Sequence, residues 1–536
     1  MAGSRITKGL RLYFLAILIA WSAVAATRAE TPPARPQIRV GHGLSIVATR
    51  KVPSAGAVAP ADTPPQTAGT VPLPFPRPRM VGFSPQVAIA TSSKRRSGFD
   101  DNAYEHQLES TYTCNFAAGP SSIPCGALFP PANFNYIIGV LDSGADADLL
   151  AGASADELGV NGNYLTGNLV PLSGIGGDQV DADISEPIGF YAQGLSAVLG
   201  SGLLNMTALV GHSNVSIVAA PTIECGGTIA VSGLVGMPLI AFHNTVIRVD
   251  TPLRVNANGR LAYSPDVRIQ SPSLPLPNFG TRLIGMTFSG LATTASFYPD
   301  FEDLETPIIP TALSLGISIP FGGSFYAPVR MLEGTPGPFN TVQTLNMLVD
   351  TGAQTSIISS VRAAQLGLPL QPDFEIDACG VSGLVEGIPG YFVDYVRIDA
   401  LGGAMEFSQA PFVVADLPSA SGGLIDGILG MNFFWNRNVI LEPIIAQPGN
   451  FVGGGNFHVS DPIPFAYGDF DLDKYVENRD TEFFLYCLTG PETGEVLPEC
   501  LHVDADESTS VDMRDYAQFL ACFSGTSTFA DPQCGP

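Results

Sequence analysis

One short motif occurs twice in this chain and limits the folds open to it more than any other feature. The segments IIGVLDSGADADLL (137–150) and NMLVDTGAQTSII (346–358) each place an Asp after an apolar run, then Ser or Thr, Gly, Ala and a second apolar run. Each copy is followed by an apolar-Gly-Met element, GLVGMPLI at 233–240 and GILGMNFF at 427–434. Because one order of elements occurs twice, we expect two homologous lobes.

The two motif acids, Asp142 and Asp350, are expected to form a catalytic pair. An Asp at the end of a buried strand is costly unless it is hydrogen-bonded or shares a proton with another acid. If the lobes pack about a pseudo-twofold axis, the two carboxyls meet there, hold one proton and titrate as a unit. Such a pair supports general acid/base hydrolysis of an amide. Expected support for the pair comes from hydroxyls that hydrogen-bond across the axis and from glycines that allow a tight turn: Ser143, Thr351, Gly144 and Gly352.

At these residues the two halves resemble lobes of aspartic peptidases, over roughly residues 100–455. DSGADADLL with GLVGM and DTGAQTSII with GILGM are similar to the retropepsin-like pattern, although both lobes lie in one chain, as in pepsin-like enzymes. SGIGG at 173–177 resembles the glycine-rich tip of the flap that closes over substrate. The resemblance implies that Asp142 and Asp350 are the catalytic aspartates. It also implies flap residues Gly174, Ile175, Gly176 and Gly177, and dyad support from Gly236 and Gly430.

Two departures from that family pattern concern the chemistry. The nearest candidate for a flap tyrosine is Tyr191, which lies beyond the Gly-rich turn. Ala145 and Ala353 follow the motif glycines where pepsin-like enzymes have Ser or Thr. Loss of a hydroxyl that could stabilise the charged pair predicts higher dyad pKa values and a pH optimum nearer neutral.

The alternatives to a peptidase are a pseudo-protease scaffold and another type of hydrolase. In the first, the fold is kept and the surface binds a partner, which would make the chain a non-enzymatic extracellular binding or assembly protein. In the second, His106, His212 and His243 would have to belong to a nucleophile motif, and no GxSxG is present. Zinc has no support either, because neither a CxxC pair nor HExxH occurs.

Composition agrees with a large exported β protein. The 536 residues include 45 Pro and 58 Gly, and only 14% are charged, which favours strands and turns. A net charge of -25 argues against a nucleic-acid-binding function.

Lys8 and Arg11 precede a short apolar run that ends in Ala23-Val24-Ala25, which is typical of a signal peptide cleaved after Ala25. We expect a secreted or cell-surface monomer with no membrane span after cleavage.

The eight cysteines should pair at least in part in an oxidising compartment. Three pairs are close enough in sequence to close small loops, and Cys225 and Cys379 are left to pair or stay buried. The three are Cys114 with Cys125, Cys487 with Cys500, and Cys522 with Cys534.

Residues 26–96 form a Pro-rich leader with the opposite charge to the rest of the chain. Residues 31–96 contain nine basic residues and one acid, Asp62. This leader is either an inhibitory pro-segment lying over an acidic cleft or a solvated tether.

The C-terminal residues contain an acidic pattern that repeats. Oxygen side chains at loop positions 1, 3, 5, 9 and 12 suit Ca²⁺, although Lys474 and Thr509 stand at position 6, where Gly is expected for the sharp turn. Asp at position 12 resembles a dockerin repeat, which implies a protein partner for this tail. The alternative is an acidic helical domain that folds without metal. The candidate ligands are Asp469, Asp471, Asp473, Glu477 and Asp480, and then Asp504, Asp506, Ser508, Asp512 and Asp515.

The predicted fold class is mainly β: two aspartic-protease-like barrels related by a pseudo-twofold axis, plus a small α-helical, dockerin- or EF-hand-like domain. The expected function is secreted aspartic endopeptidase, acting on peptide or protein substrates without a catalytic cofactor. The predicted domains are a signal peptide (1–25), the leader (26–96), an N-terminal lobe (97–304), a C-terminal lobe (305–458) and the dockerin-like domain (462–536).

Overall fold

The computed structural model describes only part of the chain, and all described residues fall in one compact unit, Ile38–Pro536. The described residues are 38–39, 45–51, 75–92, 113–114, 123–124, 136–160, 164–175, 179–185, 188–198, 204–205, 208–221, 224–225, 228–229, 232–257, 260–272, 274–289, 323–334, 342–381, 383–419, 423–447, 450–490, 496–506 and 508–535. The predicted signal peptide, the flap residues Gly176 and Gly177, and the side chains of the predicted Cys114–Cys125 pair lie outside them.

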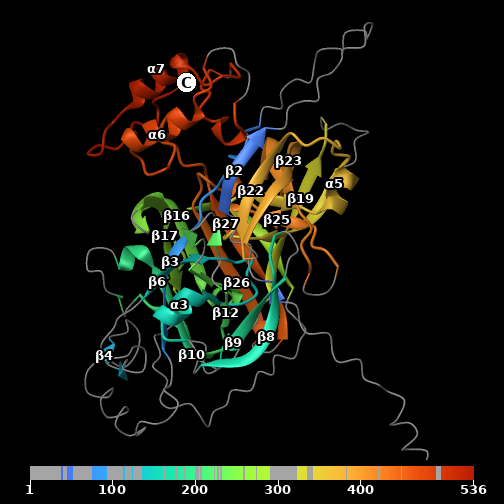
Figure 1. Cartoon of the computed structure of the whole chain (residues 1–536), viewed down its shortest axis with the longest axis vertical. Helices are drawn as coiled ribbons and strands as arrows, with labels where there is room; N and C mark the ends of the chain where they lie inside the picture. Colours follow the sequence, from blue (N-terminus) through green and yellow to red (C-terminus); the bar gives the residue numbers. More distant parts are fainter. Residues whose placement is uncertain are drawn as a thin grey trace, which may run out of the picture. The chain divides into compact units, whose positions relative to one another are not determined.

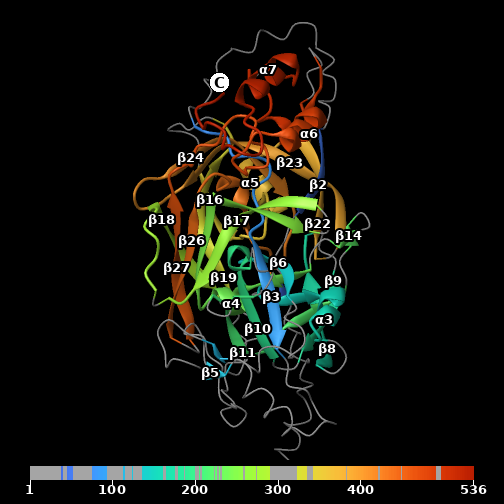
Figure 2. The same ribbon diagram turned by 90° about the vertical axis from the view of Figure 1, so that its left-hand side faces the viewer.

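Strands dominate the described residues, and most belong to two large sheets (Figures 1 and 2). The sheet with the first Asp motif has 10 strands, in the order β1 (Ile38–Arg39), β8 (Leu165–Ser173), β9 (Gln179–Ser185), β12 (Val218–Ala220), β7 (Leu149–Ala151), β15 (Gly233–Val235), β6 (Ile137–Leu141), β3 (Gln86–Ser92), β10 (Ile188–Gly194) and β11 (Val210–Val215). The mainly β fold class is thus confirmed.

The sheet with the second Asp motif has 13 strands. Their order is β17 (Arg260–Gln270), β16 (Asn244–Ala257), β26 (Val439–Gln447), β27 (Asn450–Ser460), β18 (Gly280–Ser289), β19 (Ser324–Leu332), β20 (Gln343–Val349), β25 (Gly427–Leu429), β21 (Ser356–Ile358), β24 (Met405–Val414), β23 (Gly383–Ile398), β22 (Phe374–Gly380) and β2 (Ser45–Lys51). Two short pairs, β4 (Thr113–Cys114) with β5 (Ile123–Pro124) and β13 (Glu224–Cys225) with β14 (Thr228–Ile229), stand apart from the large sheets.

Helices in the described residues are short. They are α3 (Gly152–Glu157), η2 (Leu195–Ala197), α4 (Met237–Ile240), α5 (Ser360–Leu366), η3 (Met431–Phe433), α6 (Asn478–Cys487), η4 (Pro498–Cys500) and α7 (Met513–Cys522). None of these helices is long and apolar enough to cross a membrane.

The two large sheets repeat the same strand pairings around the two Asp motifs. In the first, β6 runs parallel to β15, and β7, which follows the motif, runs antiparallel to β15. In the second, β20 runs parallel to β25, and β21 runs antiparallel to β25. A short helix follows each motif, α3 after β7 and α5 after β21. The repeat in the sequence therefore corresponds to a repeat in strand arrangement.

Part of the predicted leader, residues 26–96, pairs with strands of the two large sheets. β3 lies between β6 and β10 in the first sheet, so that sheet includes residues before the expected start at 97. Its apolar positions Val87 and Ile89 are fully buried. The strand QVAIATS directly follows a long Pro-rich stretch, and its alternation is too short to distinguish it from that stretch by sequence. The leader strands β1 and β2 pair with β8 and β22, respectively.

The apolar core continues from one sheet to the other. One cluster of buried residues includes Leu141 and Val235 beside the first motif and Val349 and Leu429 beside the second. All four side chains are essentially unexposed. Burial of this continuous apolar surface is the main stabilising term that holds the two Asp motifs in fixed positions.

The C-terminal residues form a small helical unit with its own core (red in Figures 1 and 2). Phe484 of α6 and Phe519 of α7 are fully buried, and their rings pack together at a centroid distance of 5.6 Å. Two disulfides close this unit, Cys487–Cys500 and Cys522–Cys534, as the sequence spacing predicted. Cys379 is also disulfide-bonded.

Candidate active site

Each motif Asp follows a strand whose parallel neighbour holds its backbone. Asp142 comes directly after β6, and its N–H donates to the carbonyl of Val235 on β15 at 2.9 Å. Asp350 comes directly after β20, and its N–H donates to the carbonyl of Leu429 on β25 at 3.1 Å. The apolar runs before the motifs thus become central strands, and the acids lie where those strands end.

The turn after each Asp supplies two hydrogen bonds to its carboxyl. Oδ1 of Asp142 accepts from the N–H groups of Gly144 (2.9 Å) and Ala145 (3.1 Å). Oδ1 of Asp350 accepts from Gly352 (2.8 Å) and Ala353 (3.2 Å) in the same way. These donors satisfy one oxygen of each buried carboxyl and fix its orientation.

The two motif turns are in direct contact. A Cβ added at Gly144 would lie 2.4 Å from Cγ of Asp350, and one added at Gly352 would lie 2.5 Å from Cγ of Asp142. Real Cβ atoms do not tolerate such distances, so glycine is required at both positions. The structure therefore brings together Asp142 and Asp350, which are far apart in the sequence.

Hydroxyl groups join the two turns through reciprocal hydrogen bonds. The N–H of Ser143 donates to Oγ1 of Thr351, and the N–H of Thr351 donates to Oγ of Ser143, both at 3.1 Å. Each hydroxyl then donates across to the opposite strand end at 2.8 Å, Ser143 to the carbonyl of Val349 and Thr351 to that of Leu141. Every bond has a counterpart with the two motifs exchanged, so the turns support each other equally.

The electrostatics of the pair favour a shared proton. Asp142 and Asp350 are both fully buried. Burial raises the pKa of Asp142 well above its usual value, and repulsion and a side-chain hydrogen bond with Asp350 raise it further. The N–H groups of Gly144 and Ala145 oppose this by stabilising the charged form. Two carboxyls in this arrangement do not both ionise near neutral pH.

Gly236 and Gly430 lie beneath the two turns. A Cβ at Gly236 would lie 2.3 Å from the carbonyl oxygen of Ala147, and one at Gly430 would lie 2.5 Å from that of Thr355. The N–H of Gly236 donates to Oδ1 of Asp148 at 2.7 Å, whereas the N–H of Gly430 donates to Oγ of Ser356 at 2.9 Å. The predicted supporting glycines thus pack against the motif loops.

The predicted flap is the hairpin of β8 and β9. Ile175, near its tip, is almost fully buried and packs in a cluster with Leu348, Ala353 and Ile357 of the second motif region. A Cβ at Gly380, near the end of β22, would lie 3.0 Å from Ile175. Gly174 lies beside Ile175 in the described part of the turn, whereas Tyr191 is buried in β10 between β3 and β11.

A segment of the leader that the sequence analysis did not assign to the site also packs there. The N–H of Gly82 donates to the carbonyl of Gln354 at 2.7 Å, and Met80 belongs to the same apolar cluster as Ile175 and Ala353. Alternation or motif spacing gives no signal for this contact, because the segment around Met80 is Pro-rich and irregular. The buried acid Asp148 was also missed, since it stands where the second apolar run begins.

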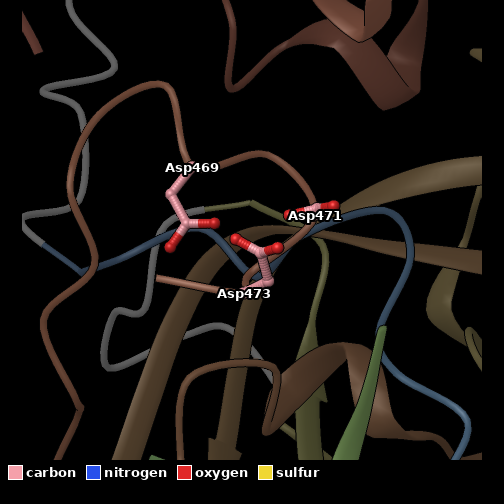
Figure 3. A group of neighbouring side chains, drawn as sticks. All are labelled: Asp469, Asp471 and Asp473. Atoms are coloured by element: carbon pink, nitrogen blue, oxygen red, sulfur yellow. The ribbon is translucent and has the colours of Figure 1, made fainter. Parts of the chain in front are cut away.

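The predicted ligands of the acidic loops are brought together in part, as Figure 3 shows for the first loop. Oxygen atoms of Asp469, Asp471 and Asp473 lie within 4.8 Å of one another, and those of Asp504, Asp506 and Asp515 do the same. The other predicted ligands hydrogen-bond within the loops: Asp480 accepts from the N–H groups of Phe470 and Glu477, Glu477 and Asp512 cap α6 and α7, and Ser508 bonds to Ser510.

The first acidic loop fits a divalent cation. Asp469 is 1% exposed, and its Oδ1 has no hydrogen-bond partner among the described residues. Burial, followed by repulsion from Asp480, Asp471 and Asp473, raises the pKa of Asp469 to about 8. Lys474 and Thr509 both adopt a left-handed φ of 70°, so the sharp turn forms without glycine at position 6. Their N–H groups donate to the position 1 acids at 2.9 Å and 2.8 Å.

Comparison with known proteins supports one part of the site. Residues 335–433 match the family model of the aspartyl proteases. This aspartyl-protease-like segment contains Asp350, Thr351, Gly352 and Gly430, and it supports a protease-like function. The first motif lies outside the matched range. No curated protein matches the chain.

Among solved structures, two basic 7S globulins are similar in part. Conglutin gamma, a basic 7S globulin from lupine seeds, is 10% identical with a TM-score of 0.27, over 70% of this chain and 96% of that one. The basic 7S globulin from soybean is 11% identical with a TM-score of 0.26, over 60% of this chain and 89% of that one. At these TM-scores the likeness carries no argument about fold or activity.

Proposed function

We propose that the chain is an aspartic endopeptidase in which Asp142 and Asp350 form the catalytic dyad. The supporting observation is the contact between the two motif turns, where no side chain larger than hydrogen fits at Gly144 or Gly352. The reciprocal bonds of Ser143 and Thr351 support two equivalent lobes about a pseudo-twofold axis. The match of residues 335–433 to the aspartyl proteases agrees with this function.

The mechanism follows from one proton shared by two buried acids. The ionised carboxyl accepts a proton from a water molecule, whose oxygen attacks the carbonyl carbon of the peptide, while the protonated carboxyl donates to the carbonyl oxygen. In the second half of the reaction the proton taken from water passes to the leaving nitrogen as the C–N bond breaks, and one hydroxyl of the tetrahedral intermediate returns its proton to the other carboxyl, which restores the singly protonated pair. The turns after Asp142 and Asp350 hold both carboxyls in place throughout, because each accepts two backbone N–H bonds.

Cleavage of a protein substrate such as casein by the purified chain tests this function. We expect pepstatin-sensitive cleavage that is lost in Asp142→Asn and in Asp350→Asn. Asp156→Asn is the matched control, because Asp156 is an exposed acid on α3 and belongs to neither motif turn. Absence of cleavage in every form of the chain between pH 3 and pH 8 would favour the alternative, a non-enzymatic binding or assembly protein on a pseudo-protease scaffold.

The leader is proposed to be an inhibitory pro-segment. β1 runs parallel to β8 with Arg39 opposite Ser173, and β2 runs antiparallel to β22 with Ser45 opposite Cys379. The leader therefore occupies the edges of the two hairpins whose ends come together at Ile175 and Gly380, where an extended peptide substrate would bind. Its basic charge complements the acidic body.

A proline in β2 tests the pro-segment. Thr49→Pro removes a backbone N–H from the strand and should weaken its pairing with β22. We expect the intact variant to cleave substrate faster than the intact wild type. Ala57→Pro lies outside β2 and is the control. Equal rates for all three chains would indicate a tether.

The C-terminal unit is proposed to be a calcium-binding, dockerin-like domain that attaches the enzyme to a protein partner. Asp469, Asp471 and Asp473 would hold the cation of the first loop, and Asp504, Asp506 and Asp515 that of the second. Leu485 on α6 and Leu520 on α7 are 58% and 50% exposed and leave apolar surface for a partner. The signal-peptide pattern supports export to the cell surface or medium, with the chain as a monomer.

A further inference from the structure

The two catalytic loops differ at one buried position beneath the dyad. Asp148 stands six residues after Asp142, and Ser356 stands six residues after Asp350. Both side chains are fully buried, and both accept the N–H of the glycine that packs under the loop. One loop therefore uses an ionisable group for a task that the other performs with a hydroxyl.

Asp148 has a single hydrogen-bond donor. Oδ1 accepts from the N–H of Gly236 at 2.7 Å, and Oδ2 has no partner among the described residues. Its sequence neighbours Ala147 and Leu149 belong to an apolar cluster with Val218 and Leu234. A charged carboxylate would be poorly solvated here, because one N–H bond does not replace the water that burial removes.

In the second loop, the hydroxyl of Ser356 both accepts and donates a hydrogen bond. Its Oγ accepts from the N–H of Gly430 at 2.9 Å and donates to Oδ1 of Asn432 at 2.8 Å. The residue that corresponds to Asn432 in the first loop is Pro238, which has no side-chain acceptor. The hydroxyl is neutral at every working pH, so the second loop does not depend on protonation at this position.

No charged side chain on the strands and helix beside Asp148 relieves its burial. The strands β6, β7, β12 and β15 and the helix α4 contain no ionisable side chain. The ionisable groups described on adjoining segments are His243, whose Nδ1 bonds to the carbonyl of Leu239, and the acids Asp142, Asp146, Asp156, Glu157, Asp181 and Asp183. Burial raises the pKa of Asp148 well above its usual value, and only the Gly236 N–H opposes this.

Asp148 is linked to the turn of Asp142 indirectly, through backbone hydrogen bonds made by residues 235–237. The N–H of Asp142 donates to the carbonyl of Val235 at 2.9 Å, and the N–H of Met237 donates to the carbonyl of Ala145 at 2.8 Å. Gly236, between these two bonds, is fixed by Asp148. Displacement of Asp148 would therefore release both ends of the turn that carries the first carboxyl.

We propose that Asp148 is a positioning residue that supports the first catalytic loop only as a neutral carboxylic acid, so that this loop alone carries a proton switch. When the pH rises far enough to remove that proton, the loop around Asp142 loosens while the loop around Asp350 stays in place. The part of the proposal that concerns activity rests on the proposed peptidase function. The part that concerns stability does not.

Unfolding measured against pH tests the switch in the full chain. Asp148→Asn keeps an oxygen for the Gly236 N–H and removes the titration. We expect wild type and variant to respond alike below about pH 4 and to diverge as the pH rises. Between the ordinary pKa of an unfolded Asp and the raised pKa of Asp148 in the folded chain, the unfolding equilibrium constant of wild type relative to the variant should increase up to about tenfold per pH unit, as one proton requires, and it should level off above that range. Curves that stay parallel up to pH 9 would overturn the proposal.

Two further variants and the pH dependence of kcat/KM test the switch without relying on Asp148→Asn alone. Ser356→Asp should give the second loop the same alkaline sensitivity, and Asp148→Ser should remove it from the first. In Asp148→Asn the alkaline limit of kcat/KM should move to higher pH, with little change on the acid side. A shift in stability without any peptidase activity would support the switch and refute the peptidase, whereas unchanged profiles in an active enzyme would refute the switch alone.

Discussion

The proposed catalytic pair, Asp142 and Asp350, and the first acidic loop both gather buried carboxyls, but they balance the charge in different ways. In the catalytic pair, each Asp accepts two backbone N–H bonds and faces one other acid. In the acidic loop, Asp469 accepts one N–H bond, from Lys474, and is repelled by Asp480, Asp471 and Asp473. Two acids with four donors need only one shared proton, whereas several acids with few donors suit a divalent cation.

This contrast shows that the type of residue does not by itself define the chemistry of an acidic site. The number of backbone donors, the number of acids and the access of a cation decide whether protons or metal ions neutralise it. Substitutions that change one of these quantities at a time therefore test the comparison directly.

The largest effect is expected where the two motif turns touch. Gly144→Ala places a Cβ 2.4 Å from Cγ of Asp350, so the turns have to move apart. We expect a loss of about 3 kcal/mol in the free energy of unfolding, at the upper end for overpacked sites, and no measurable peptidase activity. Chemical denaturation and casein cleavage measure both.

Gly159→Ala is the control for that variant, although its cause of strain differs. Gly159 has a φ of 76° and open space around its Cα, so alanine there strains the backbone without touching the dyad. A Gly144→Ala chain that keeps full activity would show that the two carboxyls do not work as a pair.

A smaller effect is expected at Asp469. Whether Asp469→Asn raises or lowers the free energy of unfolding should depend on the presence of calcium. Because its pKa in the folded chain is about 8, above the usual value of 3.8, its contribution to stability is full below about pH 4 and is lost as the pH rises through 8. Without calcium, Asp469→Asn should therefore stabilise the chain near pH 8. Calcium at a hundredfold excess over its Kd should stabilise wild type by about 2.7 kcal/mol and have less effect on the variant.

Thermal unfolding with and without chelator shows whether Asp469→Asn stabilises the chain without calcium and whether calcium stabilises wild type more than the variant. Asp531→Asn is a control, because Asp531 is an exposed acid of the same unit outside both loops. If the chelator changes neither chain and Asp469→Asn is destabilising at pH 8, the acidic loop is a structural element that folds without metal.

The sequence was sufficient to predict that the two motif acids pair, because the same motif occurs twice with the same following element. Asp142, Asp350 and the two motif glycines could be assigned without knowledge of distances, and the structure brings all four together. The role of Asp148 could not be assigned, because an acid among apolar residues has the same pattern whether it is buried or not. Its partner, the N–H of Gly236, is far away in the sequence.

Long-range strand pairing explains the other omissions. β2 pairs with β22, and no local property of either segment specifies that contact. In the C-terminal unit, the spacing identified the acids but not which of them group as candidate ligands and which accept backbone N–H bonds. Asp480 accepts backbone N–H bonds at both ends of its loop, and this depends on the exact position of α6 rather than on the residue type.

Removal of the hydroxyls that join the two turns is expected to lower the free energy of unfolding by less than the substitutions above. Thr351→Ala leaves the N–H of Ser143 and the carbonyl of Leu141 without their partner. An unsatisfied buried donor costs about 2 kcal/mol, so we expect a loss of that order in the free energy of unfolding. Ser143→Ala should cost a similar amount, because its bonds are reciprocal.

The double variant Ser143→Ala, Thr351→Ala sharpens this prediction. Since both single variants break the same network, the loss in the double variant should be smaller than the sum of the two. Denaturant unfolding of the four chains gives this coupling. Additive losses would show that the turns are held independently, contrary to equal mutual support.

The smallest effect is expected at the arginines beside the acidic loops. Nη1 of Arg479 lies 3.3 Å from Asp471 in the first loop, and Nη1 of Arg514 lies 3.8 Å from Asp506 in the second, where the arginine side chain is 73% exposed. A unit positive charge and a divalent cation about 8 Å apart in water repel by about 1 kcal/mol, and physiological salt screens roughly half of this repulsion. Arg479→Gln should therefore tighten calcium binding by about two- to three-fold, measured by isothermal titration, and Arg514→Gln should have less effect because its guanidinium is better solvated. Weaker binding in Arg479→Gln would mean that this arginine orders Asp471 for the cation, so that geometry outweighs charge in the first loop.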